Sequence, residues 1–278
     1  MQPWDVAGAL LSAALHAGWN AAVKAHRRPT EAMTAQMVLC ALIVVPALLW
    51  TGLPRSPSWP WLAASTCLNL VTVTALLRAY AVVGFGLVYP VVRALSVLLV
   101  VPAAAYLSGE MLSVYGLLGI ALIVASLLLL ALANAHANAL PRAALSWILL
   151  AGLSTAAYVM CDAQGVRHAG SPWAYGFAVS ITNAVAMSFA QSRIAMPWRI
   201  VRDHFASTLP IAIAAIVSYQ LILWVWSHAP IAPASALRDT SSVFAIVIAV
   251  VWLREPFTRL RLAAILLSAA AVPLMRLA

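Results

Sequence analysis

Long apolar segments alternate with short polar gaps along the whole chain. A helix needs about 20 mainly apolar residues to cross the hydrocarbon core of a membrane. Segments that meet this requirement lie at 5–23, 32–52, 59–79, 86–107, 112–133, 143–163, 172–191, 208–227, 233–252 and 260–277. The gaps between them, of which 192–207 is the longest, leave no room for a soluble domain. The pattern therefore predicts an all-α membrane protein with ten transmembrane helices.

The two halves of this pattern match each other when the chain is shifted by 145 residues. The stretch VYPVVRALSV (88–97) then lies on the segment around Arg238, with Arg93 on that arginine. The same shift places Glu110 on Glu255, each at the end of an apolar segment, where we expect it to cap the helix that follows. Matched charges at matched depths indicate a duplication.

A shift of 139 residues also places Trp19 on Tyr158. Because five crossings are an odd number, a second five-helix unit must enter the membrane from the opposite side. We therefore expect two inverted five-helix repeats, residues 1–139 and 140–278. In proteins built this way, a central cavity between the halves holds the site near the middle of the membrane.

The composition fits a chain that is surrounded by lipid. Hydrophobic residues make up 64% of it and charged residues only 8%, whereas soluble domains carry about 25% charged residues. The net charge of +9 is scattered over short gaps rather than clustered on an exposed domain, which argues against a nucleic-acid partner. We expect a multi-pass protein of the cytoplasmic (inner) membrane; whether it forms a homodimer is left open.

Two further features concern processing and cofactors. The first apolar segment has no Lys or Arg before it, so we expect it to remain as a membrane helix rather than to be cleaved as a signal peptide. Cys40, Cys67 and Cys161 lie inside apolar segments without metal-like spacing. We interpret them as packing residues, and we expect neither a metal site nor a cofactor.

Basic residues gather in the gaps that follow odd-numbered segments. Ten lie there: Lys24, Arg27, Arg28, Arg142, Arg193, Arg199, Arg202, Arg254, Arg259 and Arg261. On the other side are Arg55, Arg167 and Arg276. Because cytoplasmic loops of membrane proteins are enriched in Lys and Arg, this count predicts that both termini lie outside the cytoplasm.

Arg93 and Arg238 each lie six or seven residues inside an apolar segment, or about 10 Å from its start at the rise of an α-helix. A charge at mid-depth costs on the order of 3 kcal/mol or more, so it usually faces a cavity or a partner. Arg93 has no acidic residue at a matching depth, which favours a cavity. For Arg238 the sequence offers a fixed ion pair with Asp162, at the matching end of the sixth segment, or with Asp239.

Other polar and aromatic residues lie at similar depths. His16, Trp19 and Asn20 are spaced three and four residues apart and so share one face of a helix. Trp19, Tyr89 and Tyr158 could line a cavity or serve only in packing. Asp162, Asp239 and His16 are the candidates for carrying a proton. Two prolines, Pro90 and Pro233, could break the repeat-related helices that contain them.

Four stretches resemble the EamA family of the drug/metabolite transporter superfamily. They are LHAGWNAAVK (15–24), RAYAVVGFGLVYPVVRALSVLL (78–99), AYVMCDAQGVRHAG (157–170) and APIAPASALRDTSSVFAIVIAVVWLREPFTRLRLAAILL (229–267). The Gly-Glu pair that usually ends the fourth and ninth helices is present as Gly109-Glu110 but is Arg254-Glu255 in the second half.

The resemblance implies a basket of ten helices. Helices three, four, eight and nine, with parts of one and six, would line a central path. Arg93, Tyr89, Arg238, Trp19 and Tyr158 would fall on that lining. Family members are commonly described with both termini in the cytoplasm, which is opposite to the charge count.

The sequence therefore predicts a secondary transporter that moves a small organic metabolite by alternating access, with proton coupling left open. Because Arg offers paired donors to carboxylates, we expect a carboxylate-bearing, amino-acid-like or drug-like substrate held by Arg93, Tyr89, Trp19, Asn20, Arg238 and Tyr158. The alternatives are a flippase for a lipid-linked substrate and an intramembrane enzyme. The enzyme is disfavoured because neither H-E-x-x-H nor G-x-S-x-G occurs, so no catalytic residue is predicted; no nucleotide-binding loop of the G-x-x-x-x-G-K-[ST] type occurs either.

Overall fold

A computed structural model describes residues 1–83, 85–133, 141–192, 196–251 and 258–277. In these ranges the chain is helical and contains no strand. The helices are α1 (Pro3–Ala25), α2 (Pro29–Thr51), the short 3-10 helix η1 (Ser56–Ser58), α3 (Trp59–Val82), α4 (Phe85–Ser108), α5 (Val114–Ala133), α6 (Arg142–His168), α7 (Pro172–Gln191), α8 (Pro197–Trp226), α9 (Ile231–Asp239), α10 (Ser241–Val251) and α11 (Arg259–Arg276). The expected all-α class is confirmed.

Eight helical stretches in the described ranges are long and apolar enough to cross a membrane. α7 and α11 are not among them, and α9 and α10 count as one stretch, Ile231–Ile248. The chain is therefore a multi-pass membrane protein. That all ten segments cross the membrane stays a prediction, although a helix lies at each of their positions.

The ninth segment is interrupted, but not at its proline. Pro233 lies in the first turn of α9, where proline is tolerated because that turn's amide would have no helical partner. α4 likewise continues through Pro90. The interruption falls at Thr240, whose backbone N–H bonds to the carbonyls of Leu237 and Arg238 and whose hydroxyl donates to Leu237 O at 2.6 Å. The chain thus changes helix immediately after Arg238 and Asp239.

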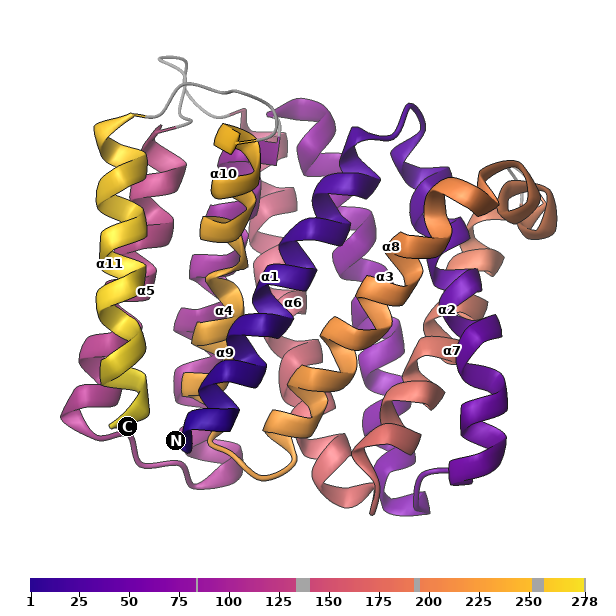
Figure 1. The fold of residues 1–278 in the computed structure, drawn as a ribbon, viewed down its shortest axis with the longest axis horizontal. Helices are drawn as coiled ribbons and strands as arrows, with labels where there is room; N and C mark the ends of the chain where they lie inside the picture. Colours follow the sequence, from indigo (N-terminus) through magenta and orange to yellow (C-terminus); the bar gives the residue numbers. More distant parts are fainter. Residues whose placement is uncertain (84, 134–140, 193–195, 252–257, 278) are drawn as a thin grey trace.

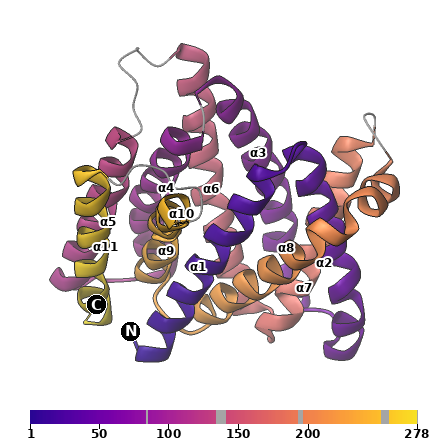
Figure 2. The same ribbon diagram turned by 45° about the horizontal axis from the view of Figure 1, so that its top comes forward.

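The helices stand side by side, and both chain ends lie at the same end of the bundle (Figure 1). Met1 N donates to Arg276 O at 3.1 Å, so the two ends touch. α5 packs against α11 at one side and α2 against α7 at the other, as both views show (Figure 2). Between them, α1 packs against α8 and α3 against α6. Each of these pairs joins the first half of the chain to the second.

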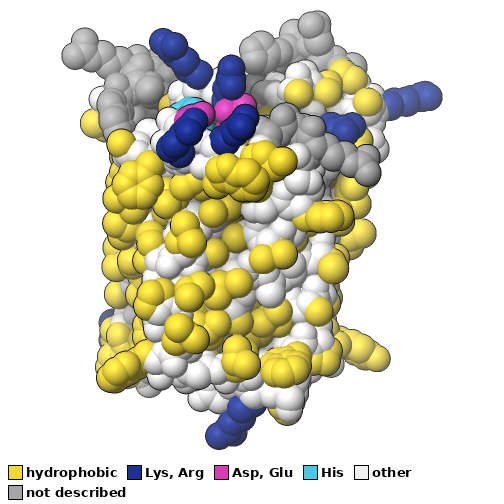
Figure 3. Space-filling model, turned by 90° about the vertical axis from the view of Figure 1, so that its right-hand side faces the viewer, with side chains coloured by type: hydrophobic (Ala, Val, Ile, Leu, Met, Phe, Trp, Pro, Cys, Tyr) yellow, Lys and Arg dark blue, Asp and Glu magenta, His cyan; other side chains and the backbone are white. Residues whose placement is uncertain are grey.

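Charged side chains lie mainly at the end of the bundle opposite the termini. One face of the molecule shows Lys and Arg gathered there above a broad apolar surface (Figure 3). The helix ends in that region contribute Lys24, Arg27, Arg28, Arg142, Arg199, Arg202, Arg259 and Arg261. Arg193 and Arg254 lie outside the described residues. This basic end is separated by the length of the bundle from Arg55, Arg167 and Arg276.

Candidate functional site

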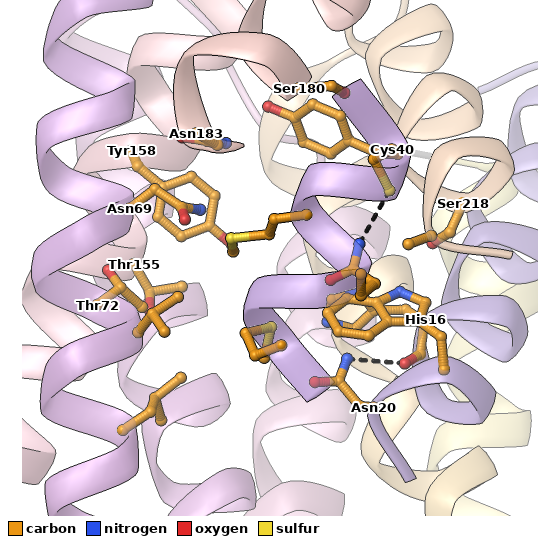
Figure 4. A pocket seen from close by; sticks show the side chains of 18 of the residues that line it. His16, Asn20, Cys40, Asn69, Thr72, Thr155, Tyr158, Ser180, Asn183 and Ser218 are labelled. Atoms are coloured by element: carbon orange, nitrogen blue, oxygen red, sulfur yellow. Dashed lines mark hydrogen bonds between the residues drawn. The ribbon is translucent and has the colours of Figure 1, made fainter. Parts of the chain in front are cut away.

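A cavity of about 150 Å³ lies among α1, α2, α3, α4, α6, α7, α8 and α9. Four aromatic side chains, four amides and two arginines line it: Trp19, Tyr89, Tyr158, Tyr219, Asn20, Gln36, Asn69, Asn183, Arg93 and Arg238. Figure 4 shows the labelled amides and hydroxyls reaching inward from several helices. Among the described residues that line the cavity, none is Asp or Glu. The described lining therefore carries two guanidinium groups and no carboxylate, and it is partly aromatic.

All six residues that the sequence proposed for substrate contact line this one cavity, and His16 lies beside them. Asp162 and Asp239 do not line it; they are buried behind it. Sequence reasoning missed the contributions of α2 and α7, which supply Gln36, Asn183 and several other lining residues. Helical spacing could have found the α2 residues, since Met33, Gln36, Met37 and Cys40 stand at positions i, i+3, i+4 and i+7, which share one face of a helix.

Arg93 is fully engaged at the centre of the bundle. Its Nη1 donates to Asp239 Oδ1 at 3.0 Å, and its Nη2 lies 2.6 Å from His16 Nε2. Because a guanidinium can only donate, His16 Nε2 must accept, so the imidazole is neutral and carries its proton on Nδ1. The guanidinium also lies 5.0 Å from the centre of the Tyr89 ring. This network joins α1, α4 and α9.

The expectation that Arg93 has no acidic partner is therefore wrong. α4 and α9 pack against each other, and this packing places the Asp239 side chain against Arg93. Successive residues of a helix point in directions about 100° apart. This divergence turns Arg238 away from Asp239 and into the cavity.

Arg238 has no ion pair and no hydrogen bond within the described part of the chain. It is only 4% exposed, and its Nε is buried without an acceptor. Its closest partners are two aromatic rings, those of Trp226 at 5.6 Å and Tyr219 at 6.0 Å. Because aromatic faces accept none of its N–H groups as an oxygen would, these donors are available to an anion in the cavity.

Asp162 does not pair with Arg238 directly, which corrects the other sequence-based expectation. Its carboxylate is completely buried and accepts hydrogen bonds from the hydroxyls of Tyr219 and Tyr175, the latter at 3.3 Å. Gly165, three residues along α6, leaves space for the Tyr175 hydroxyl, which a Cβ at that position would meet. Tyr219 therefore connects Asp162, through its hydroxyl, with Arg238, against its ring.

A second charged cluster lies near the termini. The Glu110 carboxylate accepts from the backbone N–H groups of Ile231 at 2.7 Å and Ala232 at 3.2 Å, the first two residues of α9. Arg167 pairs with Glu110 at 3.2 Å and donates to the carbonyl of Ala229 at 2.9 Å. Glu110 therefore caps α9 of the other half, not the helix that follows it as expected. Glu255 lies outside the described residues.

Further contacts close the bundle between this cluster and the cavity. Ser12 Oγ of α1 donates to Ser218 O of α8 at 2.6 Å, and Ser218 Oγ returns a bond to Ser12 O at 2.8 Å. Nearer the termini, His228 Nε2 lies 2.8 Å from Asp5 Oδ1. The cavity is thus separated from the end that carries the termini by polar contacts between α1, α8 and the α8–α9 turn.

Residues 142–277 match the EamA-like transporter family. By its second half, this chain belongs to the EamA-like transporter family. The resemblance noted in the sequence is thereby confirmed, and the protein is a membrane transporter. Because the family consists of transporters, the match also supports a protein that is not an enzyme.

A solved crystal structure, described only as that of a protein, resembles this EamA-like transporter over its whole length. The alignment covers 98% of this chain and 95% of the other, with a TM-score of 0.74 and 15% sequence identity. At this identity the likeness shows the fold alone, and it covers both halves of the chain. No curated protein matches the chain significantly.

Proposed function

We propose that this transporter is a secondary carrier of a small organic anion, with a carboxylate as the group that it recognises. Arg238 carries the proposal, because it is a buried guanidinium that lines the cavity and, among the described residues, makes no ion pair and no hydrogen bond. A buried guanidinium whose donors lack an acceptor is costly, and a bound carboxylate would offset that cost through two parallel hydrogen bonds. A cationic substrate would meet two arginines and no described carboxylate in the lining.

The remaining lining residues suit the body of such a substrate. Trp19, Tyr89 and Tyr158 offer aromatic surface, and Asn20 offers an amide. The side-chain oxygens of Gln36 and Asn183 are buried without a hydrogen-bond partner. Buried acceptors of this kind are usually satisfied, so the favoured anion also carries N–H or O–H donors. This description includes amino-acid-like and drug-like carboxylates.

Arg93 has a different role in this proposal. Because Asp239 neutralises it and His16 accepts from it, it holds α1, α4 and α9 together beside the cavity. Its charge is then a weaker attraction for a substrate than that of Arg238. Tyr89, which stacks near Arg93 and whose hydroxyl lies 3.1 Å from Ser241 Oγ, supports the same junction.

Transport by alternating access follows from two inverted five-helix repeats, residues 1–139 and 140–278, the boundary of which lies outside the described residues. The packing supports this arrangement: the first helix of each half packs against the third of the other, and the second and fifth pack against their counterparts. Exchange of the halves leaves such a pattern unchanged. With the basic end in the cytoplasm of an inner-membrane protein, both termini face outside.

The test is transport into proteoliposomes of labelled carboxylates found by a toxicity-resistance screen in cells that overproduce the chain. Replacing Arg238 with Gln should reduce the transport rate about 30-fold or more, because it removes the protein's member of the charge pair that Arg238 would form with the substrate carboxylate. Arg238→Lys should retain part of the activity. Arg202→Gln, at a charge that is largely exposed, is the matched control and should have no effect. Wild-type rates in Arg238→Gln, at equal protein abundance, would refute the assignment.

A further inference from the structure

Four charged side chains lie in the interior of the bundle, away from its two ends. Arg93, Asp162, Arg238 and Asp239 are each no more than 6% exposed. Arg93 and Asp239 form one neutral pair. Arg238 and Asp162 do not touch each other, and each contacts Tyr219 instead. With both ionised, the interior carries two positive and two negative charges and is neutral as a whole.

We infer that Asp162 is a proton-binding site coupled to anion binding at Arg238, so that one proton accompanies each monovalent anion. The inference rests on the proposed function. When an anion joins Arg238, the interior acquires one uncompensated negative charge. A proton taken from water by the Asp162 carboxylate cancels it, and the proton leaves again when the anion leaves. Because an uncompensated buried charge costs several kcal/mol, each event favours the other, as linkage requires.

Asp162 fits this role better than the other two proton-carrier candidates. His16 Nε2 already accepts from Arg93, so a proton there would displace that donor. Asp239 lies in direct contact with Arg93, which stabilises its ionised form. Asp162 has two phenol donors and, among the described residues, no cation within ion-pair distance. The titratable and charged groups around it are Cys161 on α6, Tyr175 on α7, Tyr219 on α8 and Arg238 on α9.

Tyr219 supplies a physical connection between the two events. Its hydroxyl donates to Asp162, and its ring, 6.0 Å from the Arg238 guanidinium, forms part of the cavity wall. A carboxylate accepts such a bond more strongly than a protonated carboxyl does. Proton binding at Asp162 therefore releases the Tyr219 hydroxyl, which can then turn toward a ligand in the cavity.

The proton site can be tested without any substrate. Infrared spectra of the reconstituted full-length protein at pH 8 report protonated carboxyl groups through their C=O stretch. Arg238→Gln should gain one such group, because Asp162 loses its balancing charge, and Arg238→Gln/Asp162→Asn should lack it. Arg238→Lys, which keeps the charge, should resemble the wild type. Arg93→Gln is the matched control: its new carboxyl should vanish with Asp239→Asn and persist with Asp162→Asn. An Arg238→Gln spectrum without a new carboxyl group would overturn the inference.

The coupling is then measured with benzoate, which combines one carboxylate with an aromatic body suited to the lining. Calorimetric titration in two buffers of different ionisation enthalpy gives the number of protons taken up per benzoate bound. We expect up to about one proton for the wild type, as charge balance requires, and none for Asp162→Asn. Benzoate binding without proton uptake would contradict the coupling. Failure of benzoate to bind would count against the proposed function, while the infrared result still decides the proton site.

Discussion

Arg93 and Arg238, which align when the chain is shifted by 145 residues, have different surroundings. Arg93 meets a carboxylate, an imidazole and an aromatic ring, whereas Arg238 meets two aromatic rings. The sequence located both arginines and the aromatic residues near them, because charges inside apolar segments are conspicuous. It paired the charges wrongly because the pairing depends on how each helix is rotated about its axis, and depth alone does not determine rotation.

We expect Asp239→Asn to be strongly destabilising, since it leaves Arg93 as an uncompensated buried charge. Loss of one partner of a buried pair costs about 3–5 kcal/mol. Thermal unfolding in detergent measures this. Adding Arg93→Gln should recover much of the loss, because the double variant contains no buried charge at this position.

The exposed pair of Arg202 and Asp203 provides the control for that measurement. Exposed ion pairs contribute about 0–1 kcal/mol, so Asp203→Asn should hardly change the unfolding temperature. Equal effects of Asp203→Asn and Asp239→Asn would show that the Arg93 pair has no special weight.

At the scale of helices, α9 is a short element fixed at both ends. Glu110 and Arg167 hold its first turn, and its last two residues are Arg238 and Asp239. The apolar pattern predicted where the helices lie because length and hydropathy suffice for that. It did not predict the interruption at Thr240 or the extension of α8 back to Pro197, because Arg199, Arg202 and Asp203 lower the hydropathy of a segment that is helical all the same.

We expect Glu110→Gln to weaken the closure at the end that carries the termini. The carboxylate makes charge-assisted hydrogen bonds to α9 and Arg167. Losing such a bond costs about 1.5–3 kcal/mol, which raises the population open at this end about tenfold or more. Labelling of Cys40, which lines the cavity, measures this in a Cys67→Ala/Cys161→Ala background. An impermeant maleimide, added on the side of the membrane where the chain termini lie, should react with Cys40 about tenfold faster in Glu110→Gln than in the wild type.

The matched control for that labelling is Glu31→Gln. Glu31 bonds to Arg28 at 3.1 Å and to His204 at 3.0 Å, at the opposite, basic end. It should leave labelling from the end of the termini unchanged. If both variants label alike, Glu110 does not act on one end of the cavity.

At the scale of the whole molecule, the basic end and the end with both termini are separated by the apolar surface (Figure 3). The charge count of the sequence predicted this separation because it depends only on the order of the gaps. The cavity could not be predicted in the same detail, since eight helices from both halves contribute to it. Its lining follows from how the halves pack across each other.

The orientation of the molecule leads to a further expectation. A reporter at the C-terminus that is active only outside the cytoplasm, such as alkaline phosphatase, should be active, because the basic end favours the cytoplasm. A fusion in the gap after α1, near Arg27, should be inactive. The reverse pattern would place both termini in the cytoplasm, as is commonly described for the family.

The pair of Arg93 with Asp239 also bears on the history of the chain. In the proposed arrangement of two inverted repeats, an ancestor with identical halves would have paired each arginine with the aspartate of the other copy. The position that corresponds to Asp239 in the first half is Ala94, which is buried in α4. Because Ala94 has no carboxyl group, Arg238 lacks the counterpart of the ion pair that Asp239 makes with Arg93. Ala94→Asp should restore that symmetry, giving a stable but inactive transporter, whereas Ala94→Asn should lack the added ion pair.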